Sequence, residues 1–399
     1  MSDATAKPEG GQIRPAWGAV LSMALCVAML IASEFMPVSL LTPMAEGLGA
    51  SQGQTGQAIA ISGLFAVVAS LLITTVAGRL NRKWVMVTLT GMMLVSLAMV
   101  AAAQSFAMLM LARGLLGICI GGFWALATAV IMRLVPEAEV PRALALMYGG
   151  QAIAAAFAAP LGSYLGDLVG WRGVFWALTP LVAINLLWHL VALPSLPAGR
   201  GRSFGTLIAV LRRGYFARGI FAAMLSWGAA FTMFTYLRPY LEQVTGADVT
   251  TLSVLLLVLG CAGFLGTWAS GRFVGGAIAA QLKLPALVMG AATLGLLLTG
   301  AAPVITAGLL ILWGAMNTAM SVIFMTWMSR NVDDAPEEGG SLMVAAIQAS
   351  ILLGAVFGGA LLDLFSIHAT LLGSVALSVA AVALIGNGRK MLKPGSGPV

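Results

Sequence analysis

The chain has 399 residues, of which 60% are hydrophobic and only 9% are charged. A soluble domain carries about 25% charged residues because its surface faces water, so this composition excludes a soluble globular protein. The formal net charge of +7 would suit a nucleic-acid-binding protein only if the basic residues shared a soluble face. The three cysteines lie in separate apolar runs, a pattern that supports neither a disulfide framework nor a zinc site.

Apolar runs long enough to cross a membrane recur along the whole chain. A membrane helix needs about 20 mostly apolar residues, and twelve such runs are present. They cover residues 17–41, 55–77, 84–103, 106–131, 143–166, 173–193, 219–241, 251–271, 284–302, 305–328, 341–365 and 369–387. We therefore expect an all-α polytopic membrane protein with twelve transmembrane helices.

The longest polar stretch, residues 194–218, divides these spans into two sets of six. It contains Pro, Gly, Ser and five Arg, a composition typical of a connecting segment. We expect a cytoplasmic tail at 1–16, a six-helix bundle at 17–193, a cytoplasmic linker at 194–218, a second bundle at 219–388 and a cytoplasmic tail at 389–399. The first apolar run is too long for a removable signal peptide and should remain as a span.

The basic residues indicate how the spans are oriented. If both termini are cytoplasmic, 18 of the 21 Lys and Arg residues fall in cytoplasmic segments. These are Lys7, Arg14, Arg79, Arg82, Lys83, Arg133, Arg142, Arg200, Arg202, Arg212, Arg213, Arg218, Arg272, Lys283, Arg330, Arg389, Lys390 and Lys393. Arg172 alone falls outside, and Arg113 and Arg238 lie within spans. This bias follows the positive-inside rule and accounts for the net charge without nucleic acid.

The two halves carry the same short motifs in the same order, offset by 193 to 197 residues. The pairs are Pro43-x-x-Glu46 with Pro239-x-x-Glu242, Gly78-Arg79-Leu80 with Gly271-Arg272-Phe273, Arg133 with Arg330, Gln151 with Gln348, and Gly162 and Asp167 with Gly358 and Asp363. Parallel six-helix repeats occur in secondary transporters, which bind substrate between the halves near the membrane midplane. The sequence therefore predicts a transporter with an internal repeat.

Several other activities lack their motifs. No G-x-x-x-x-G-K-[ST] phosphate loop is present, so we expect transport to draw on an ion gradient rather than on ATP, with no cofactor. No nucleophile, metal or acid–base constellation indicates an enzyme. A non-transporting membrane receptor on the same scaffold is a further alternative, but it would have no need of a membrane-embedded acid, and the expected tails are short.

One acidic residue, Glu34, lies within an apolar segment. A charged side chain at the bilayer centre costs roughly 2.5–3.5 kcal/mol on insertion scales, so it is usually paired, protonated or directed toward a cavity. A structural, hydrogen-bonded carboxyl is one interpretation. The other is a proton carrier that loads and releases a proton as water access changes. Arg113 lies at a matching depth in the fourth span and can approach Glu34 if spans one and four are neighbours.

Two aromatic stripes and several amides are candidates for substrate contact. Residues 3, 4, 7 or 11 apart share a helix face, which groups Arg113, Ile120 and Trp124 on one span and Trp227, Phe231, Phe234 and Arg238 on another. Packing is the alternative explanation for either stripe. Asn317, Gln151 and Gln348 supply hydrogen-bonding groups for a polar ligand. For Asn185 and His189 both roles stay open, with helix packing favoured for His189.

Three segments resemble the major facilitator superfamily, in particular its drug:H⁺ antiporter-1 branch. RGLLGICIGG (Arg113 to Gly122) resembles the fourth-span motif, and APLGSYLGDLVGWRGVF (Ala159 to Phe175) resembles the antiporter fifth-span motif. AGRLNRK (Ala77 to Lys83) resembles the loop motif after the second span. It departs from the family pattern at Gly78, where an acid is usual, and at Asn81, where Gly is usual, so that acid's gating contact is not carried over.

Further segments resemble the purine ribonucleoside efflux pumps of Gram-negative bacteria. They are RPAWGAV, EFMPVSLLTPMAEGLG, GGFWALATAVIMRLVP, LPSLP and FTYLRPYLE. The resemblance implies export of inosine- or guanosine-like nucleosides and purine base analogues in exchange for protons, by a monomer in the bacterial inner membrane. Sugar-efflux relatives share much of the first-span motif, so a sugar or multidrug H⁺ antiporter is the alternative. The expected partners are a small-molecule substrate, protons and membrane lipid.

Overall fold

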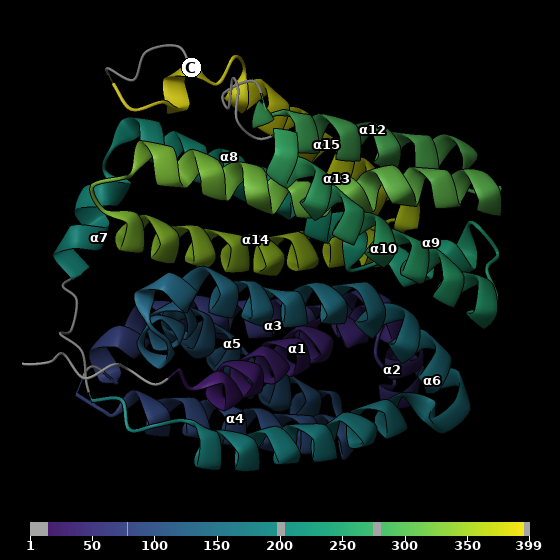
Figure 1. The fold of residues 1–399 in the computed structure, drawn as a ribbon. Coiled ribbons are helices and arrows are strands. Elements are labelled where there is room, and N and C mark those ends of the chain that lie inside the picture. Colours follow the sequence, from purple (N-terminus) through teal and green to yellow (C-terminus); the bar gives the residue numbers. More distant parts are fainter. Residues whose placement is uncertain (1–14, 78, 198–203, 274–280, 395–399) are drawn as a thin grey trace, which may run out of the picture.

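The computed structural model describes residues 15–77, 79–197, 204–273 and 281–394, and every regular element in these ranges is helical. The first bundle contains α1 (Trp17–Ser39), α2 (Leu41–Leu48), α3 (Gln52–Val76), α4 (Arg82–Ala101), α5 (Phe106–Leu134), η1 (Glu137–Glu139) and α6 (Val140–Ala192). The second contains α7 (Phe204–Leu211), α8 (Gly214–Phe234), α9 (Leu237–Gln243), α10 (Val249–Phe273), α12 (Leu284–Thr299), α13 (Pro303–Asn331), α14 (Pro336–Leu364), α15 (Ile367–Ile385) and η2 (Arg389–Met391). The two bundles lie one above the other (Figure 1).

The twelve predicted spans are confirmed. Ten helices of the described chain are long and apolar enough to cross a membrane, and α12 is a shorter apolar helix at the ninth predicted position. The remaining span is found within α6, which holds the fifth and sixth predicted spans as two arms that meet at Gly170. Gly170 has φ 72° and ψ 159°, a conformation that essentially only glycine adopts, so it marks the turn between the arms.

Several helices extend beyond their predicted ends. Helices α5 and α13 each contain 29 residues, about 44 Å at 1.5 Å per residue, which covers the headgroup regions as well as the hydrocarbon core. The predicted spans stop where polar residues begin, whereas a helix continues while its backbone is paired. For the same reason α7 and the start of α8 occupy part of the predicted linker 194–218. Gly78, residues 198–203 and the outer parts of both tails lie outside the described residues.

The repeat is visible where each half begins. The first predicted span is a long helix, α1, that breaks at Leu40 and continues as the short helix α2. The seventh span shows the same break between α8 and α9. Pro43 and Pro239 each occupy the third position of the short helix, where a missing backbone N–H removes no helical hydrogen bond. The matching motifs thus form matching structures.

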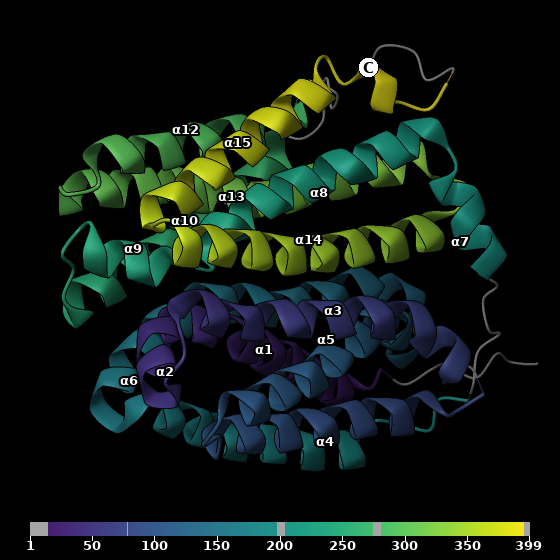
Figure 2. The ribbon, with the colours of Figure 1, turned by 180° about the vertical axis from the view of Figure 1, so that it is seen from behind.

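Each half has its own hydrophobic core. One cluster of buried apolar residues draws its members from residues 19 to 196 only. The other comes mainly from residues 210 to 391, and it also contains Val38, Leu41, Ile59 and Ala159 of the first half. Helices α3 and α14 lie side by side between the bundles in both views (Figures 1 and 2). Helices α6 and α10 also meet between the bundles. A Cβ at Gly260 of α10 would collide with the Ala156 carbonyl of α6, so glycine at this position allows the two helices to pack closely.

Backbone contacts define two ends of the molecule. At one end, which we call the terminal end, the Ala16 amide donates to the Leu134 carbonyl at 2.8 Å and the Arg82 amide to the Leu196 carbonyl at 2.8 Å. The opposite end carries α2 and α9 (Figure 1), and we call it the α2–α9 end. Arg172, the basic residue predicted to lie apart from the others, is at the α2–α9 end, where its Nη2 donates to the Ala103 carbonyl at 2.8 Å.

Candidate functional site

The halves are joined by side-chain hydrogen bonds at the α2–α9 end. Within the described ranges, every such bond between halves connects residues 39–53 with residues 236–243 or with Asp363. The bonds run from Arg238 to the Ser39 carbonyl, from Thr42 to Glu242 (2.6 Å), from Gln243 to Gln52 (3.2 Å), from Ser51 and the Gly53 amide to Asp363 (2.5 and 3.1 Å), and from Tyr236 to the Gly53 carbonyl (3.5 Å). We call these the closing contacts, because they hold this end shut.

Glu34 lies in the last two turns of α1, just inside the closing contacts. Its side chain is 7% exposed, and within the described chain it makes no hydrogen bond or ion pair. The next residue, Phe35, meets the rings of Phe231 and Phe234 across the interface, with centroids 6.5 and 5.7 Å apart. Phe234 also stacks on Trp313 of α13 at 6.0 Å. These four rings form what we call the aromatic cluster, which contains residues from both halves.

Arg113 of α5 is fully buried and hydrogen-bonded to two neighbouring helices. Its Nη1 donates to the Ser33 carbonyl of α1 at 2.7 Å, its Nε to the Ala58 carbonyl at 3.0 Å and its Nη2 to Ser62 Oγ at 3.0 Å, both of α3. The Ser33 carbonyl is free to accept because the residue four positions later is Pro37, which has no N–H.

The structure brings Arg113 close to Glu34 without an ion pair. The guanidinium bonds to the backbone of Ser33, the residue directly before Glu34, so the two sites are neighbours, as the matching depths predict. No ion pair of 4.0 Å or less joins the two side chains. The structure therefore places the buried Arg113 guanidinium near a buried carboxyl that it does not pair with directly.

The predicted substrate residues fall into three groups. Phe231 and Phe234 belong to the aromatic cluster, and Trp227 packs on Phe324 with centroids 5.3 Å apart. Trp124 stacks on Tyr148 at 6.0 Å and 21°, with Gln151 one turn further along α6. Of the amides, Gln348 is 6% exposed on α14 and Asn317 is half-buried on α13.

Arg238 is not with the other members of its predicted stripe. It lies on α9, beyond the break that ends α8, and pairs with Glu242 at 2.7 Å while it also donates to the Ser39 carbonyl. The structure therefore places it among the closing contacts. A helix-face argument could not foresee this, because the break in the helix interrupts the 3.6-residue period.

Sequence reasoning missed four features of the site. Phe35 and Trp313 gave no separate signal within their apolar runs. Ser62 is one of many small polar residues. Asp363 was recognised only as a match to Asp167, although it accepts two of the closing contacts. The free Ser33 carbonyl could have been predicted from Pro37, because a proline four residues later in a helix cannot donate to that carbonyl.

A cavity of about 780 Å³ lies at the α2–α9 end, beside the closing contacts. Its lining comes from both halves and includes Thr42, Glu46, Ser51, Gln52, Gln243, Asp363, Ser366 and His368. In the part of the chain that the structure describes, no group of three His, Cys, Asp or Glu side chains is placed to hold a metal ion.

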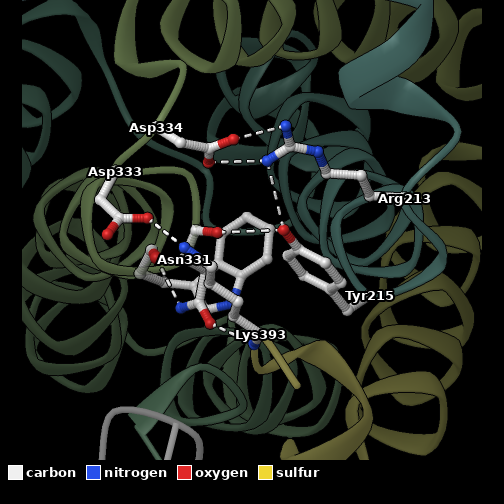
Figure 3. Close-up of polar contacts among 7 residues, drawn as sticks. Arg213, Tyr215, Asn331, Asp333, Asp334 and Lys393 are labelled. Carbon is white, nitrogen blue, oxygen red and sulfur yellow. Dashed lines mark hydrogen bonds and ion pairs between the residues drawn. The ribbon is translucent and has the colours of Figure 1, made fainter. Parts of the chain in front are cut away.

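A polar network ties three segments together at the terminal end (Figure 3). Arg213 pairs with both carboxylate oxygens of Asp334 at 2.8 and 2.6 Å, and this holds the pKa of Asp334 down at about 2. Lys393 donates through its Nζ to Asp333 at 2.6 Å and through its amide to Asn331 at 2.7 Å. The start of α8, the loop after α13 and the segment after η2 are thus connected within the second half.

Two six-helix bundles that share an aromatic cluster, with a buried acid directly beside it in the chain, have the architecture of a secondary transporter. The sequence profile described as Major Facilitator Superfamily matches residues 23–343. The chain belongs to that superfamily and is a membrane transporter of its kind.

Relatives carry two different names. The chain is 45% identical over 373 residues to the transcription regulatory protein OpdE of Pseudomonas aeruginosa, with 92% of each chain covered. It is 37% identical over 395 residues to the purine ribonucleoside efflux pump NepI of Escherichia coli K12, covering 98% of this chain and all of the relative.

Solved structures support the fold. A bacterial homologue of the human lysosomal transporter Spinster, inward-facing and unoccupied, matches with a TM-score of 0.79 at 16% identity over 96% of this chain and 99% of the other. A mutant of the nucleoside transporter NupG matches with a TM-score of 0.75 at 16% identity over 93% and 99%. At this identity the likeness concerns the fold alone.

Proposed function

We propose that this protein exports purine ribonucleosides and purine base analogues in exchange for protons, by alternating access, with Glu34 as the proton carrier. The observation that carries the proposal is the position of Glu34. It is buried in α1 with no hydrogen bond or ion pair in the described chain, near the charge of Arg113 and directly before Phe35, whose ring crosses the interface between the halves. An acid in this position can respond to substrate and to the relative position of the halves.

The coupling follows from the two states of Glu34. Protonation from outside is favoured when the α2–α9 end is open, and a substrate that binds from the cytoplasm favours release of the proton inward. Exchange of one proton for a neutral nucleoside moves one charge, worth about 2.3 kcal/mol per 100 mV. Membrane voltage therefore assists export together with the pH difference.

The substrate class is supported by NepI and by the chemistry of the site. Flat aromatic side chains such as Phe231 and Phe234 stack on purine rings, and the amides of Asn317, Gln151 and Gln348 suit the polar edges of the base and ribose. Trp124 and Trp227 provide further ring surface in each half. We assign Arg238 to the opening and closing of the α2–α9 end.

We further propose that the protein works as a monomer in the bacterial inner membrane, with the terminal end in the cytoplasm. Arg82, Arg213 and Lys393 lie at the terminal end, which the positive-inside rule assigns to the cytoplasm. Its partners are the substrate, protons and lipid. The proposal requires no cofactor and no nucleic acid.

Uptake of radiolabelled inosine into inverted membrane vesicles tests this function. Uptake should depend on an imposed proton gradient and collapse when a protonophore is added. Glu34→Gln should abolish gradient-driven uptake while the protein inserts normally, whereas Glu46→Gln, a change at an exposed acid of the neighbouring helix α2, should leave it intact. Undiminished gradient-driven uptake by Glu34→Gln would overturn the mechanism.

A competition panel separates the proposed substrate class from sugar or multidrug export. Unlabelled nucleosides should inhibit inosine uptake, and arabinose-like sugars and lipophilic cations should not. The reverse pattern would reassign the substrate while leaving the transporter fold and the role of Glu34 in place.

The name of OpdE raises a second candidate function, control of transcription. A strain that lacks this gene should be complemented with the wild-type chain or with Glu34→Gln, and its transcripts compared. If the transcript levels depend on transport, the strain complemented with Glu34→Gln will have the same transcripts as the strain that lacks the gene. Restoration of wild-type transcripts by the transport-deficient variant would favour regulation by the protein itself.

A further inference from the structure

Asn317 lies between two aromatic ring pairs that connect α8 and α13. Trp313 stacks on Phe234 at 6.0 Å and 13°, and Phe324 meets Trp227 at 5.3 Å. On α13, Asn317 is four residues after Trp313 and seven before Phe324, so all three share one helix face. The amide therefore lies in an otherwise aromatic and apolar strip of that face.

Neither polar atom of the Asn317 amide has a partner among the described residues. Its Oδ1 is buried and accepts no hydrogen bond, and its Nδ2 donates to no residue of the described chain. The neighbouring Thr318, in contrast, donates to the Gly263 carbonyl of α10 at 2.5 Å. Buried polar groups in native proteins are nearly always paired, so the buried, unpaired Oδ1 beside aromatic rings requires an explanation.

Two other side chains with an unpaired buried atom differ from Asn317. Asn185 Oδ1 and His189 Nε2 are also unpaired, but each side chain is held through its other polar atom. Asn185 donates to the Ser22 carbonyl at 2.8 Å, and His189 Nδ1 bonds Thr90 at 3.0 Å. These two side chains lie inside the first bundle, where they connect helices, whereas neither amide atom of Asn317 has a hydrogen-bond partner in the described chain.

We propose that Asn317 determines specificity by reading a donor–acceptor edge of the substrate ring. A carboxamide presents one acceptor and two donors, and it pairs with a flat ring that carries an N–H beside an acceptor. The N1–H and O6 of a 6-oxopurine form such an edge. Rings on both sides of Asn317 favour a flat partner. The inference rests on the proposed nucleoside transport and deepens it, because it selects inosine and guanosine by their lactam edge.

Two inosine analogues test this edge. In 1-methylinosine a methyl group replaces the N1 hydrogen, and purine riboside lacks both the N1 hydrogen and O6. With wild-type protein in inverted vesicles, both analogues should inhibit inosine uptake at least about fivefold less strongly than inosine does, since a good bidentate pair distinguishes bases by about 1–3 kcal/mol. Asn317→Leu should raise the KM for inosine about tenfold, remove this discrimination and leave the maximal rate largely unchanged.

Control variants keep the test decisive. Asn317→Gln retains the amide and should restore part of the discrimination, and Thr318→Val should leave the ratio between inosine and its analogues unchanged. If Asn317→Leu fails to fold, Asn317→Ala, which is smaller and has no polar side-chain atom, should show the same loss. An unchanged ratio in these variants overturns this inference alone, whereas absence of inosine uptake by the wild-type protein overturns the proposed function as well.

Discussion

Arg113 shows how one buried side chain can connect three helices without an ion pair. Its three hydrogen bonds go to two backbone carbonyls and one hydroxyl, and one of those carbonyls is available only because of Pro37. A guanidinium stays protonated at any relevant pH. Arg113 therefore supplies a constant charge next to Glu34, and its position is set by α1 and α3 together.

Replacing Arg113 should be costly in a way that depends on Pro37. Arg113→Leu leaves the Ser33 carbonyl without a donor, and we expect a loss of stability on the order of 3 kcal/mol. In a Pro37→Ala background, the new N–H at position 37 takes that carbonyl, so the same replacement should cost less. Thermal unfolding of the four proteins in one detergent measures this coupling. Additive effects would show that Pro37 plays no part in positioning Arg113.

At the scale of residues, the sequence predicted which side chains matter better than what they contact. Glu34 and Arg113 stood out because charges are expensive in a membrane, and the structure places them together. The actual partners of Arg113 are backbone carbonyls, which every residue has, so no residue pattern identifies them. Phe35 and Trp313 resemble any apolar residue of a span until the two halves are brought together.

Among the elements, α6 depends on the conformation of Gly170. Gly170→Ala should lower the melting temperature and the yield of folded protein, because a φ near +72° with extended ψ costs a residue with a Cβ about 1–3 kcal/mol. The control is Gly149→Ala in the first arm of α6, where the position is helical and no atom lies within 4 Å of the new methyl group. Gly149→Ala should leave the melting temperature unchanged or raise it slightly. If both variants lower the melting temperature equally, the backbone conformation of Gly170 is not what the turn requires.

The ion pair between Arg213 and Asp334 at the terminal end should contribute to stability in a way that depends on pH. Arg213 lowers the pKa of Asp334 from 3.8 to about 2, so the charged form stabilises the folded state above pH 3.8 and this contribution is lost as the pH falls through 2. Asp334→Asn should therefore lower the melting temperature by the same amount from about pH 8 to about pH 5. Glu139→Gln, which removes an exposed 3.8 Å pair with Arg142, should have little effect. If the difference in melting temperature between Asp334→Asn and the wild-type protein becomes smaller between about pH 8 and about pH 5, the pKa of Asp334 is not lowered by Arg213.

Element by element, the sequence predicted the number and order of the spans but not their ends. Hydropathy detects the lipid-facing stretch, whereas helices such as α5 and α13 continue into the polar boundary. The breaks at Leu40 and between α8 and α9 were also missed, since the residues on both sides are apolar. The repeat of Pro43 and Pro239 was the signal that the two breaks correspond.

For the molecule as a whole, the closing contacts determine which end is shut. Asp363 accepts two of these bonds at the start of α3, where a negative charge is also favoured by the helix dipole. Asp363→Ala should shift the protein toward opening of the α2–α9 end. Its counterpart in the repeat, Asp167, makes no hydrogen bond with the described residues, so Asp167→Ala is the matched control.

Opening at this end is measurable with a cysteine at position 39. Ser39 is fully buried, so Ser39→Cys, in a chain without its three native cysteines, should react slowly with a membrane-impermeant maleimide. Asp363→Ala should accelerate the reaction several-fold and Asp167→Ala should not. Equal rates in all three proteins would show that Asp363 does not hold the end closed.

The first hydrophobic core contains residues of the first half only, whereas the second contains residues of both halves. This difference has a consequence for biosynthesis. The first core is complete within residues 19–196, so a ribosome that has passed the linker has already delivered every residue that this bundle needs. The second core takes Val38, Leu41, Ile59 and Ala159 from the first half. The first bundle can therefore assemble in the membrane while synthesis continues, and its surface then serves as a template on which the second bundle completes its packing.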